Sequence, residues 1–229
     1  MVNKSTIFEE RRVRLKQSSQ VDISGINKYL SLIREELKPE IEVNNGKIIC
    51  VLQGIVGSPS NEFVQINRFP DLYTYQQMQN ILNNKGASLL QSKETRLFKS
   101  ITSRPKDPLP IEDHRPIYSD RRFFLRNYDV EKCADLSENL IWPLYEAWGV
   151  RVLGLFTTLL TNDIQEVIMF AGYNSIAQWE ETRNIGFAAR PKKISQMIWN
   201  EGKKAVIKRA ELTLRSTVSL MKAIYLTKN

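Results

Sequence analysis

One sequence pattern that occurs twice constrains this chain more than any other feature. Residues 150–184, VRVLGLFTTLLTNDIQEVIMFAGYNSIAQWEETRN, and residues 47–80, KIICVLQGIVGSPSNEFVQINRFPDLYTYQQMQN, each contain two apolar runs around a polar turn, followed by a helix-like segment. In each copy the second run ends in an aromatic residue, and the helix has another aromatic residue at the same spacing. These pairs are Tyr173 with Trp179 and Phe69 with Tyr75. A duplicated strand, turn, strand, helix unit therefore organises the chain.

Shorter patterns extend this unit to both halves of the chain. Alternating side chains predict strands over 6–16 and 121–129, and apolar residues three and four positions apart predict helices after them. Two more segments, 91–101 and 212–225, can close the halves as strands. The resulting order, β-α-β-β-α-β in each half, is that of tandem ferredoxin-like repeats in an α+β protein.

Prolines mark the boundary between the halves and matching points within them. The segment 105–116 is rich in proline and charge, so we place it as the linker between a first repeat, 1–104, and a second repeat, 117–229. Pro39 and Pro143 lie at matching positions of the two repeats. Each should bend or end the helix in which it lies.

The composition is that of an ordinary soluble globular protein. The 229 residues have a net charge of +8, but Lys and Arg are mixed with Asp and Glu along the whole chain, and no nucleic-acid-binding motif accompanies them. Residues 1–15 lack the apolar core of a signal peptide, and the longest apolar run, 152–160, is interrupted by Gly154 and two threonines. We therefore expect a cytoplasmic protein that binds neither nucleic acid nor a membrane.

Few residues could support metal or cofactor chemistry. His114 is the single histidine and lies in the linker, which argues against a Ser-His-Asp triad and makes it a poor axial ligand for haem. Cys50 and Cys133 lack the spacing of metal ligands and fit buried structural thiols. The chain also has no glycine-rich phosphate loop. The sequence thus predicts no metal and no cofactor.

A set of motifs resembles a known family. In the first strand the order is aromatic, Glu, any, Arg, any, apolar, any, Leu; later come Gly, an apolar strand, Gly, Phe and Thr, and then a strand ending before a Trp-bearing helix. The matching residues are Phe8, Glu9, Arg11, Val13, Leu15, Gly149, Gly154, Phe156, Thr157, Tyr173, Ser175 and Trp179. The chain resembles the NIPSNAP family of the dimeric α/β-barrel superfamily, in two tandem copies. The second copy departs from the family in having Phe124 in place of the strand glutamate, and it keeps Arg126 and Tyr128.

This resemblance implies an architecture and a set of catalytic candidates. Two antiparallel sheets would face each other in a dimeric α/β-barrel architecture with helices outside, ligands would lie between a sheet and its helices, and the protein could associate into a homo-oligomer. The predicted catalytic residues, pointing from the first strands toward the helices, are Glu9, Arg11, Arg126 and Tyr128. An arginine there could hold a carboxylate or enolate. Alternatively, Glu9 and Arg11 form a structural ion pair on one strand face.

A polar pair distinguishes the third strand of the first half. Gln65 and Asn67 share one face of the strand, and their counterparts in the second half are Met169 and Ala171. We therefore expect one polar pocket that can orient a ligand and one apolar pocket. The alternative is that Gln65 and Asn67 face solvent at a thinly covered sheet.

Two tryptophans are candidates for stacking on a ligand. Trp142 lies directly before Pro143, and Trp179 lies on the helix of the better preserved copy. We predict that both bind substrate together with Gln65 and Asn67. For each tryptophan the alternative is a place in the apolar core, where aromatic residues at helical spacing usually lie.

The leading functional hypothesis is a NIPSNAP-like protein of a biosynthetic pathway that acts on a small organic molecule. A cofactor-independent enzyme could isomerise, cyclise or rearrange an apolar substrate with a carbonyl or anionic group, because such chemistry requires an enclosed pocket, a positioned acid or base and a cation near the developing negative charge. One alternative is a cofactor-free monooxygenase of the same superfamily. Another is a non-catalytic ligand-binding or scaffold protein.

Overall fold

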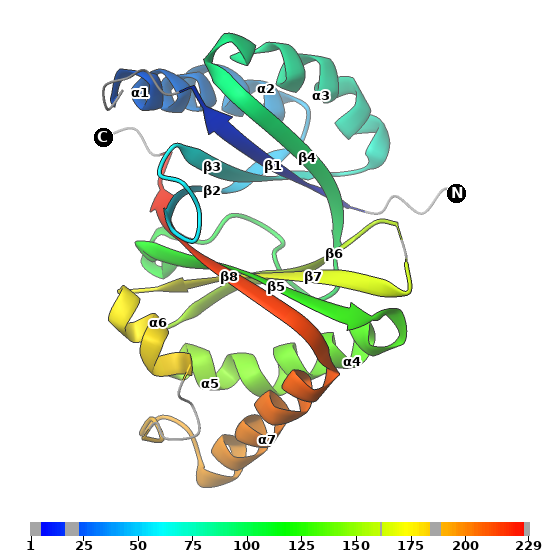
Figure 1. Ribbon diagram of the computed structural model, residues 1–229, viewed down its shortest axis with the longest axis vertical. Helices are drawn as coiled ribbons and strands as arrows, with labels where there is room; N and C mark the ends of the chain where they lie inside the picture. Colours follow the sequence, from blue (N-terminus) through cyan, green and yellow to red (C-terminus); the bar gives the residue numbers. More distant parts are fainter. Residues whose placement is uncertain (1–5, 17–22, 161, 184–188, 227–229) are drawn as a thin grey trace. The chain divides into compact units, whose positions relative to one another are not determined.

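Two compact units make up the fold. The computed structural model describes residues 6–16, 23–160, 162–183 and 189–226 (Figure 1). The first unit lies within residues 1–99 and 222–229, and the second within residues 100–221. Each unit has an antiparallel sheet with its helices packed on one face (Figure 1). The fold class is therefore α+β, with helices outside antiparallel sheets, as the sequence predicts.

The first unit has the strand order β4-β1-β3-β2. Its helices bury an apolar cluster against the sheet, which includes Ile33, Leu37 and Phe63. The elements are β1 (Ile7–Leu15), α1 (Ile23–Ser31), η1 (Leu32–Leu37), α2 (Lys38–Val43), β2 (Lys47–Val56), β3 (Glu62–Phe69), α3 (Leu72–Asn84), η2 (Ala87–Leu89) and β4 (Leu90–Ser100).

The second unit repeats this arrangement, with the strand order β8-β5-β7-β6. One helix, α7, is extra: between α3 and β4 the first unit has only the short η2. The elements are η3 (Ile111–Asp113), β5 (Ile117–Arg126), η4 (Asn127–Asp129), α4 (Val130–Asp135), η5 (Leu136–Ile141), α5 (Trp142–Ala147), β6 (Arg151–Thr158), β7 (Ile164–Tyr173), α6 (Ile176–Arg183), α7 (Gln196–Leu212) and β8 (Thr213–Ile224).

A π-helical turn interrupts the first long helix of each unit at the same place. The segments η1 and η5 are π-helical, and each leads directly into a short α-helix that has Pro39 or Pro143 in its first turn. The residue before each proline donates its amide five positions back, so the regular hydrogen-bond ladder is already interrupted where the proline lacks a donor. The sequence predicts that each proline bends or ends its helix. The prolines do not end the helices, because the helical path continues to Val43 in the first unit and to Ala147 in the second.

Gly154 belongs to the motif that resembles the NIPSNAP family, and the structure gives a packing reason for it. A Cβ added at this position would lie 2.5 Å from Cδ of Pro105 and 2.9 Å from the carbonyl oxygen of Arg104. The backbone at residues 104 and 105 thus packs directly on β6. Any larger residue at position 154 would push this segment away from the strand.

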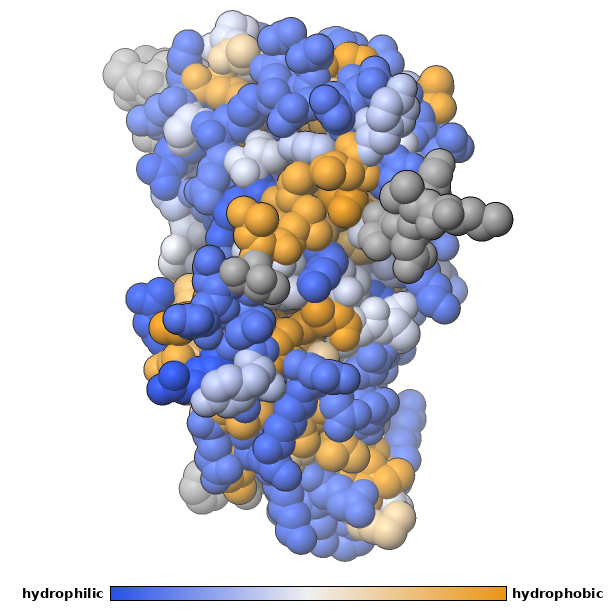
Figure 2. Space-filling model, turned by 90° about the vertical axis from the view of Figure 1, so that its right-hand side faces the viewer, coloured by the Kyte–Doolittle hydropathy of each residue, from blue (hydrophilic) through white to orange (hydrophobic). Residues whose placement is uncertain are grey.

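Most of the surface seen in Figure 2 is hydrophilic, with apolar side chains gathered in patches. The exposed large apolar side chains include Val43, Tyr128 and Leu160. No helix within the described residues combines the length and the apolar character needed to cross a bilayer.

Candidate functional site

The strand registers show which residues of the two units are equivalent. Arg11 of β1 lies opposite Gln65 of β3, and Arg121 of β5 lies opposite Met169 of β7. Because Gln65 and Met169 hold matching positions in the duplicated pattern, Arg121 is the counterpart of Arg11. By the same pairing, the counterpart of Glu9 is Ser119.

An ion-pair ladder on the opposite face of each sheet supports this equivalence. Arg12 contacts Glu10 at 3.2 Å and Glu62 at 2.6 Å, and Arg122 contacts Asp120 at 3.1 Å and Glu166 at 2.8 Å. Acidic, Arg, Arg is thus the shared motif of β1 and β5. It was visible in the sequence, and it is the signal that would have identified Arg121.

In the first unit the predicted residues do come together. Asn67 Nδ2 donates to Glu9 Oε2 at 2.7 Å, and Gln65 Nε2 donates to Asn67 Oδ1 at 2.7 Å. All three side chains and Arg11 are at most 2% exposed, so the alternative that Gln65 and Asn67 face solvent is wrong. Burial raises the pKa of Tyr29, beside Arg11, to about 12, which keeps its phenol neutral. These residues form a buried polar cluster under the helices.

Burial makes the stability of this cluster depend on pH. It raises the pKa of Glu9 above the ordinary 4.5, although the hydrogen bond from Asn67 and the charge of Arg11 oppose the shift. The folded state therefore holds this proton more tightly than the unfolded state does. The resulting stability is fully present below pH 4.5 and is lost as pH rises through the folded-state pKa.

Glu9→Gln should remove this dependence. As pH falls from neutral toward 4.5, wild type should gain unfolding free energy relative to the variant, as measured by urea denaturation. Glu35→Gln, an exposed carboxylate in η1, is the control and should leave the profile unchanged. Parallel profiles for wild type and Glu9→Gln would contradict the shift.

A cavity of about 410 Å³ lies in the second unit, between its sheet and its helices. The volume suits a small organic ligand. Its lining combines aromatic and cationic side chains, and none of the described lining residues is a carboxylate or a histidine. The lining residues are Arg121, Phe123, Tyr145, Met169, Tyr173, Trp179, Thr182, Arg183, Val206, Arg209, Ala210, Thr213, Leu214, Arg215 and Ser216.

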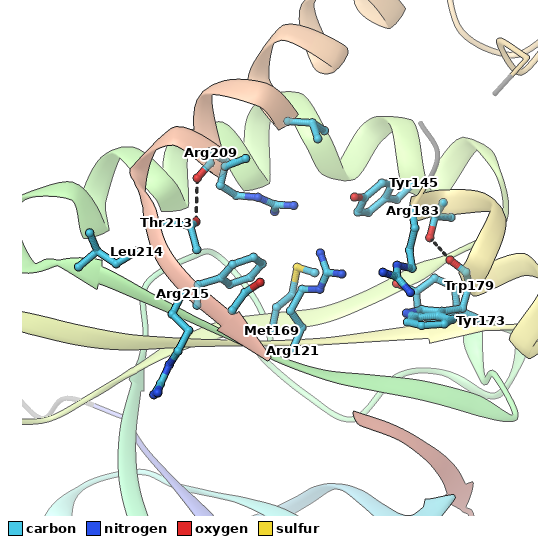
Figure 3. Close-up of a pocket in the computed structure, with 15 residues that line it drawn as sticks. Arg121, Tyr145, Met169, Tyr173, Trp179, Arg183, Arg209, Thr213, Leu214 and Arg215 are labelled. Atoms are coloured by element: carbon cyan, nitrogen blue, oxygen red, sulfur yellow. Dashed lines mark hydrogen bonds between the residues drawn. The ribbon is translucent and has the colours of Figure 1, made fainter. Parts of the chain in front are cut away.

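Three of the four arginines point into this cavity from different elements (Figure 3). Arg121 comes from β5, Arg183 from α6 and Arg209 from α7. None of the three forms an ion pair with another described residue. Instead Arg183 lies over the Trp179 ring at 4.9 Å, and Arg121 and Arg209 lie over Phe123 at 5.8 and 4.9 Å.

Arg209 and Arg215 differ in their contacts and in the direction in which they point. Arg209 is 3% exposed and donates from Nη1 to Ser137 Oγ at 3.1 Å. Arg215 points away from the cavity and lies over Phe124 on the other face of the sheet, at 4.1 Å. The cations available to a ligand are therefore Arg121, Arg183 and Arg209.

Electrostatics in the cavity favour a negative ligand. Burial lowers the pKa of Arg121, and the positive charges of Arg209 and Arg183 lower it further, whereas Tyr145 and Tyr173 act in the opposite direction. A guanidinium nevertheless stays charged at neutral pH. Burial also raises the pKa of Tyr173, so its phenol is neutral and can donate a hydrogen bond.

Of the other predicted site residues, one lines the cavity and three do not. Trp179 lines the cavity, but Trp142 is fully buried in the core, with Arg104 over its ring at 4.9 Å. Arg126 is exposed at the end of β5, and Tyr128 is 76% exposed in η4, so neither is brought to the cavity. The pocket of the second unit, expected to be apolar, is cationic and aromatic, because β5, α6 and α7 supply arginines that the comparison of third strands could not reveal.

The cavity does not suit a haem held by histidine. His114 Nε2 lies 3.1 Å from the carbonyl oxygen of Leu109, and His114 is not a lining residue. Histidine and cysteine, the commonest protein ligands of haem iron, are thus missing from the described lining. Within the described residues, no group of three or more His, Cys, Asp and Glu side chains could hold a metal ion.

Comparisons by sequence give no match, either to models of known protein families or to curated proteins. Comparison of structures does find relatives. An anthrone oxidase-like protein has a TM-score of 0.56 at 10% identity, over 97% of this chain and 93% of that one. A provisionally assigned monooxygenase from Fusobacterium nucleatum has a TM-score of 0.60 at 6% identity, over 98% and 94%.

A third relative is a chlorite dismutase from Candidatus Nitrospira defluvii, with a TM-score of 0.54 at 11% identity, over 98% of this chain and 93% of that one. Each match spans nearly the whole of both chains. Likeness at such low identity establishes the fold and not the activity. The chain thus has the dimeric α/β-barrel fold, built from two tandem ferredoxin-like repeats.

Proposed function

We propose that the second unit binds a small organic anion with an aromatic or other apolar body and acts on it without a cofactor. The observation that carries this proposal is the cavity with three arginines, Arg121, Arg183 and Arg209, that form no ion pair with another described residue and lie beside aromatic rings. Arg209 is buried and Arg121 is partly buried, whereas Arg183 is exposed. A buried cation without a counterion is costly, and an anionic ligand would offset that cost at Arg209 and Arg121. The rings of Phe123 and Trp179 supply apolar surface for its body.

The arrangement suits reactions in which the substrate develops an enolate. Arg121 and Arg209 could hold the enolate oxygen through charge-assisted hydrogen bonds, and the neutral phenol of Tyr173 could donate a further bond. Since no described lining residue is a carboxylate or histidine, water would accept the proton. Isomerisation, cyclisation or rearrangement of an activated carbonyl compound is therefore the reaction class that we propose.

Cofactor-free monooxygenation is the second candidate. It is favoured by the names of the structural relatives, which include an anthrone oxidase-like protein and two provisionally assigned monooxygenases. In such a reaction an activated CH₂ group and one O₂ give a carbonyl group and one water. The same stabilised carbanion would begin both reactions, so the cavity is compatible with either.

We also propose that the protein is NIPSNAP-like, that it has a biosynthetic role in the cytoplasm, and that it assembles into a homo-oligomer. For the first unit we propose a structural role: Glu9, Gln65 and Asn67 link β1 to β3 through buried hydrogen bonds, and Arg11 lies beside Tyr29 of α1. If a ligand binds and is not converted, the protein is a binding protein without catalysis.

Phenylpyruvate is a suitable probe, because it combines an aromatic ring, a carboxylate and an enolisable carbonyl. We expect it to bind, as measured by calorimetry, and the protein to accelerate exchange of its CH₂ protons in D₂O, as measured by NMR. Anthrone under air tests monooxygenation through equimolar oxygen uptake. Binding without exchange or oxygen uptake would indicate a binding protein, and absence of binding to any aromatic anion would overturn the proposal.

A further inference from the structure

We infer that the ligand of the second unit's cavity is an organic dianion with two separated anionic groups, such as a carboxylate together with a second carboxylate, a phenolate or an enolate. This inference rests on the proposed function and specifies its substrate class. The evidence is the number, the pairing and the placement of the cations in the lining.

The count of charges is the first argument. Arg121, Arg183 and Arg209 all point into one cavity of about 410 Å³, and no carboxylate among the described lining residues offsets them. Burial is the main cause of the lowered pKa of Arg121, and the positive charges of Arg209 and Arg183 act in the same direction. One negative charge would leave two of the three positive charges uncompensated, whereas two negative charges would leave only one.

The placement of the cations is the second argument. Arg121 and Arg209 share the ring of Phe123, whereas Arg183 lies over Trp179, toward Tyr173 (Figure 3). The positive charge is therefore divided between a pair of guanidinium groups near Phe123 and a third at Trp179. Two anionic groups at opposite ends of one ligand match this division better than a single group does.

The walls of the cavity decide between an organic and an inorganic dianion. Phe123, Met169 and Val206 provide apolar contact surface between the sheet and α7. A phosphate or sulfate ion would leave these side chains without a partner, whereas an aromatic or aliphatic body would cover them. The structure therefore favours an organic skeleton that joins the two anionic groups.

A ligand series on the intact protein tests this inference. Isophthalate, benzoate and sulfate are titrated into the protein by calorimetry at one fixed ionic strength, so that screening is equal for all three. Isophthalate should bind at least tenfold more tightly than either of the others. Equal affinity of isophthalate and benzoate would overturn the dianion and leave the proposed function intact, because an aromatic anion would still bind.

Two further outcomes complete the series. Sulfate binding as tightly as isophthalate would overturn the requirement for two separated groups on an organic body. If neither aromatic acid binds, the proposed function fails as well.

Substitution on α7 gives an independent measurement. Arg209→Met should reduce the advantage of isophthalate over benzoate to less than threefold, because one of the cations near Phe123 is lost. Lys208→Met, on the same helix and exposed, is the matched control and should retain the full advantage. A full advantage in folded Arg209→Met would contradict the inference, and if that variant does not fold, the wild-type series still decides.

Discussion

Replacing Arg121 with methionine should weaken the binding of isophthalate roughly a hundredfold, because an arginine that meets a buried anionic group contributes about 3 kcal/mol when its partner would otherwise be unpaired. The same substitution should leave the free protein as stable as wild type or more stable. Arg121 has no ion pair with another described residue and is repelled by Arg209 and Arg183. Methionine keeps an unbranched apolar side chain and removes the guanidinium group with its charge.

The combination of weaker binding and undiminished stability is specific to a ligand-binding arginine, since loss of a structural arginine would lower both. Arg126→Met is the matched control, because Arg126 lies on the same strand but is exposed at its end. We expect its affinity to stay within twofold of wild type. If Arg126→Met loses the ligand and Arg121→Met does not, the proposed binding site at Arg121 is wrong.

Trp142→Ala should lower the free energy of unfolding by about 3–5 kcal/mol, the usual cost of removing a large buried aromatic side chain. Trp142 is fully buried, and its loss also removes the ring on which Arg104 lies. Since domains of this kind are stable by only about 5–15 kcal/mol, the variant should unfold at much lower urea concentration.

Trp179→Ala is the informative comparison, because Trp179 is only half-buried and lines the cavity. It should lose much less stability than Trp142→Ala but bind isophthalate more weakly. Trp142→Phe preserves most of the buried ring and should retain wild-type affinity. Weaker binding by a stably folded Trp142→Phe variant would show that Trp142 contacts the ligand after all.

The duplicated pattern predicted the strands well, because hydrophobic alternation and turn residues are local signals. Residues 6–16 and 212–225 contain β1 and β8, and residues 91–101 cover β4 except its first residue, Leu90. The first strand of the second half was harder. The segment 121–129 contains three arginines, and aligning Arg126 with Arg11 missed that β5 begins at Ile117 and that Asp120, Arg121 and Arg122 repeat the motif of β1.

The site was less predictable than the fold, for physical reasons that particular residues illustrate. Trp142 and Trp179 both lie on helices, and only packing decides that one is core and the other lines a cavity. Arg209 comes from α7, which has no counterpart in the first unit, so comparison of the halves could not find it. Gln65 and Asn67 do mark a difference between the halves. They are buried members of a polar cluster, and Gln65 donates a hydrogen bond to Asn67.

The π-helical turns have a consequence for the history of the chain. A π-turn arises when one residue is inserted into an α-helix, and such turns are rare and tend to persist at functional sites. Here η1 and η5 have the same length and the same distance to the following proline. This coincidence fits one duplicated helical unit, in which the π-turn and the proline after it were copied together.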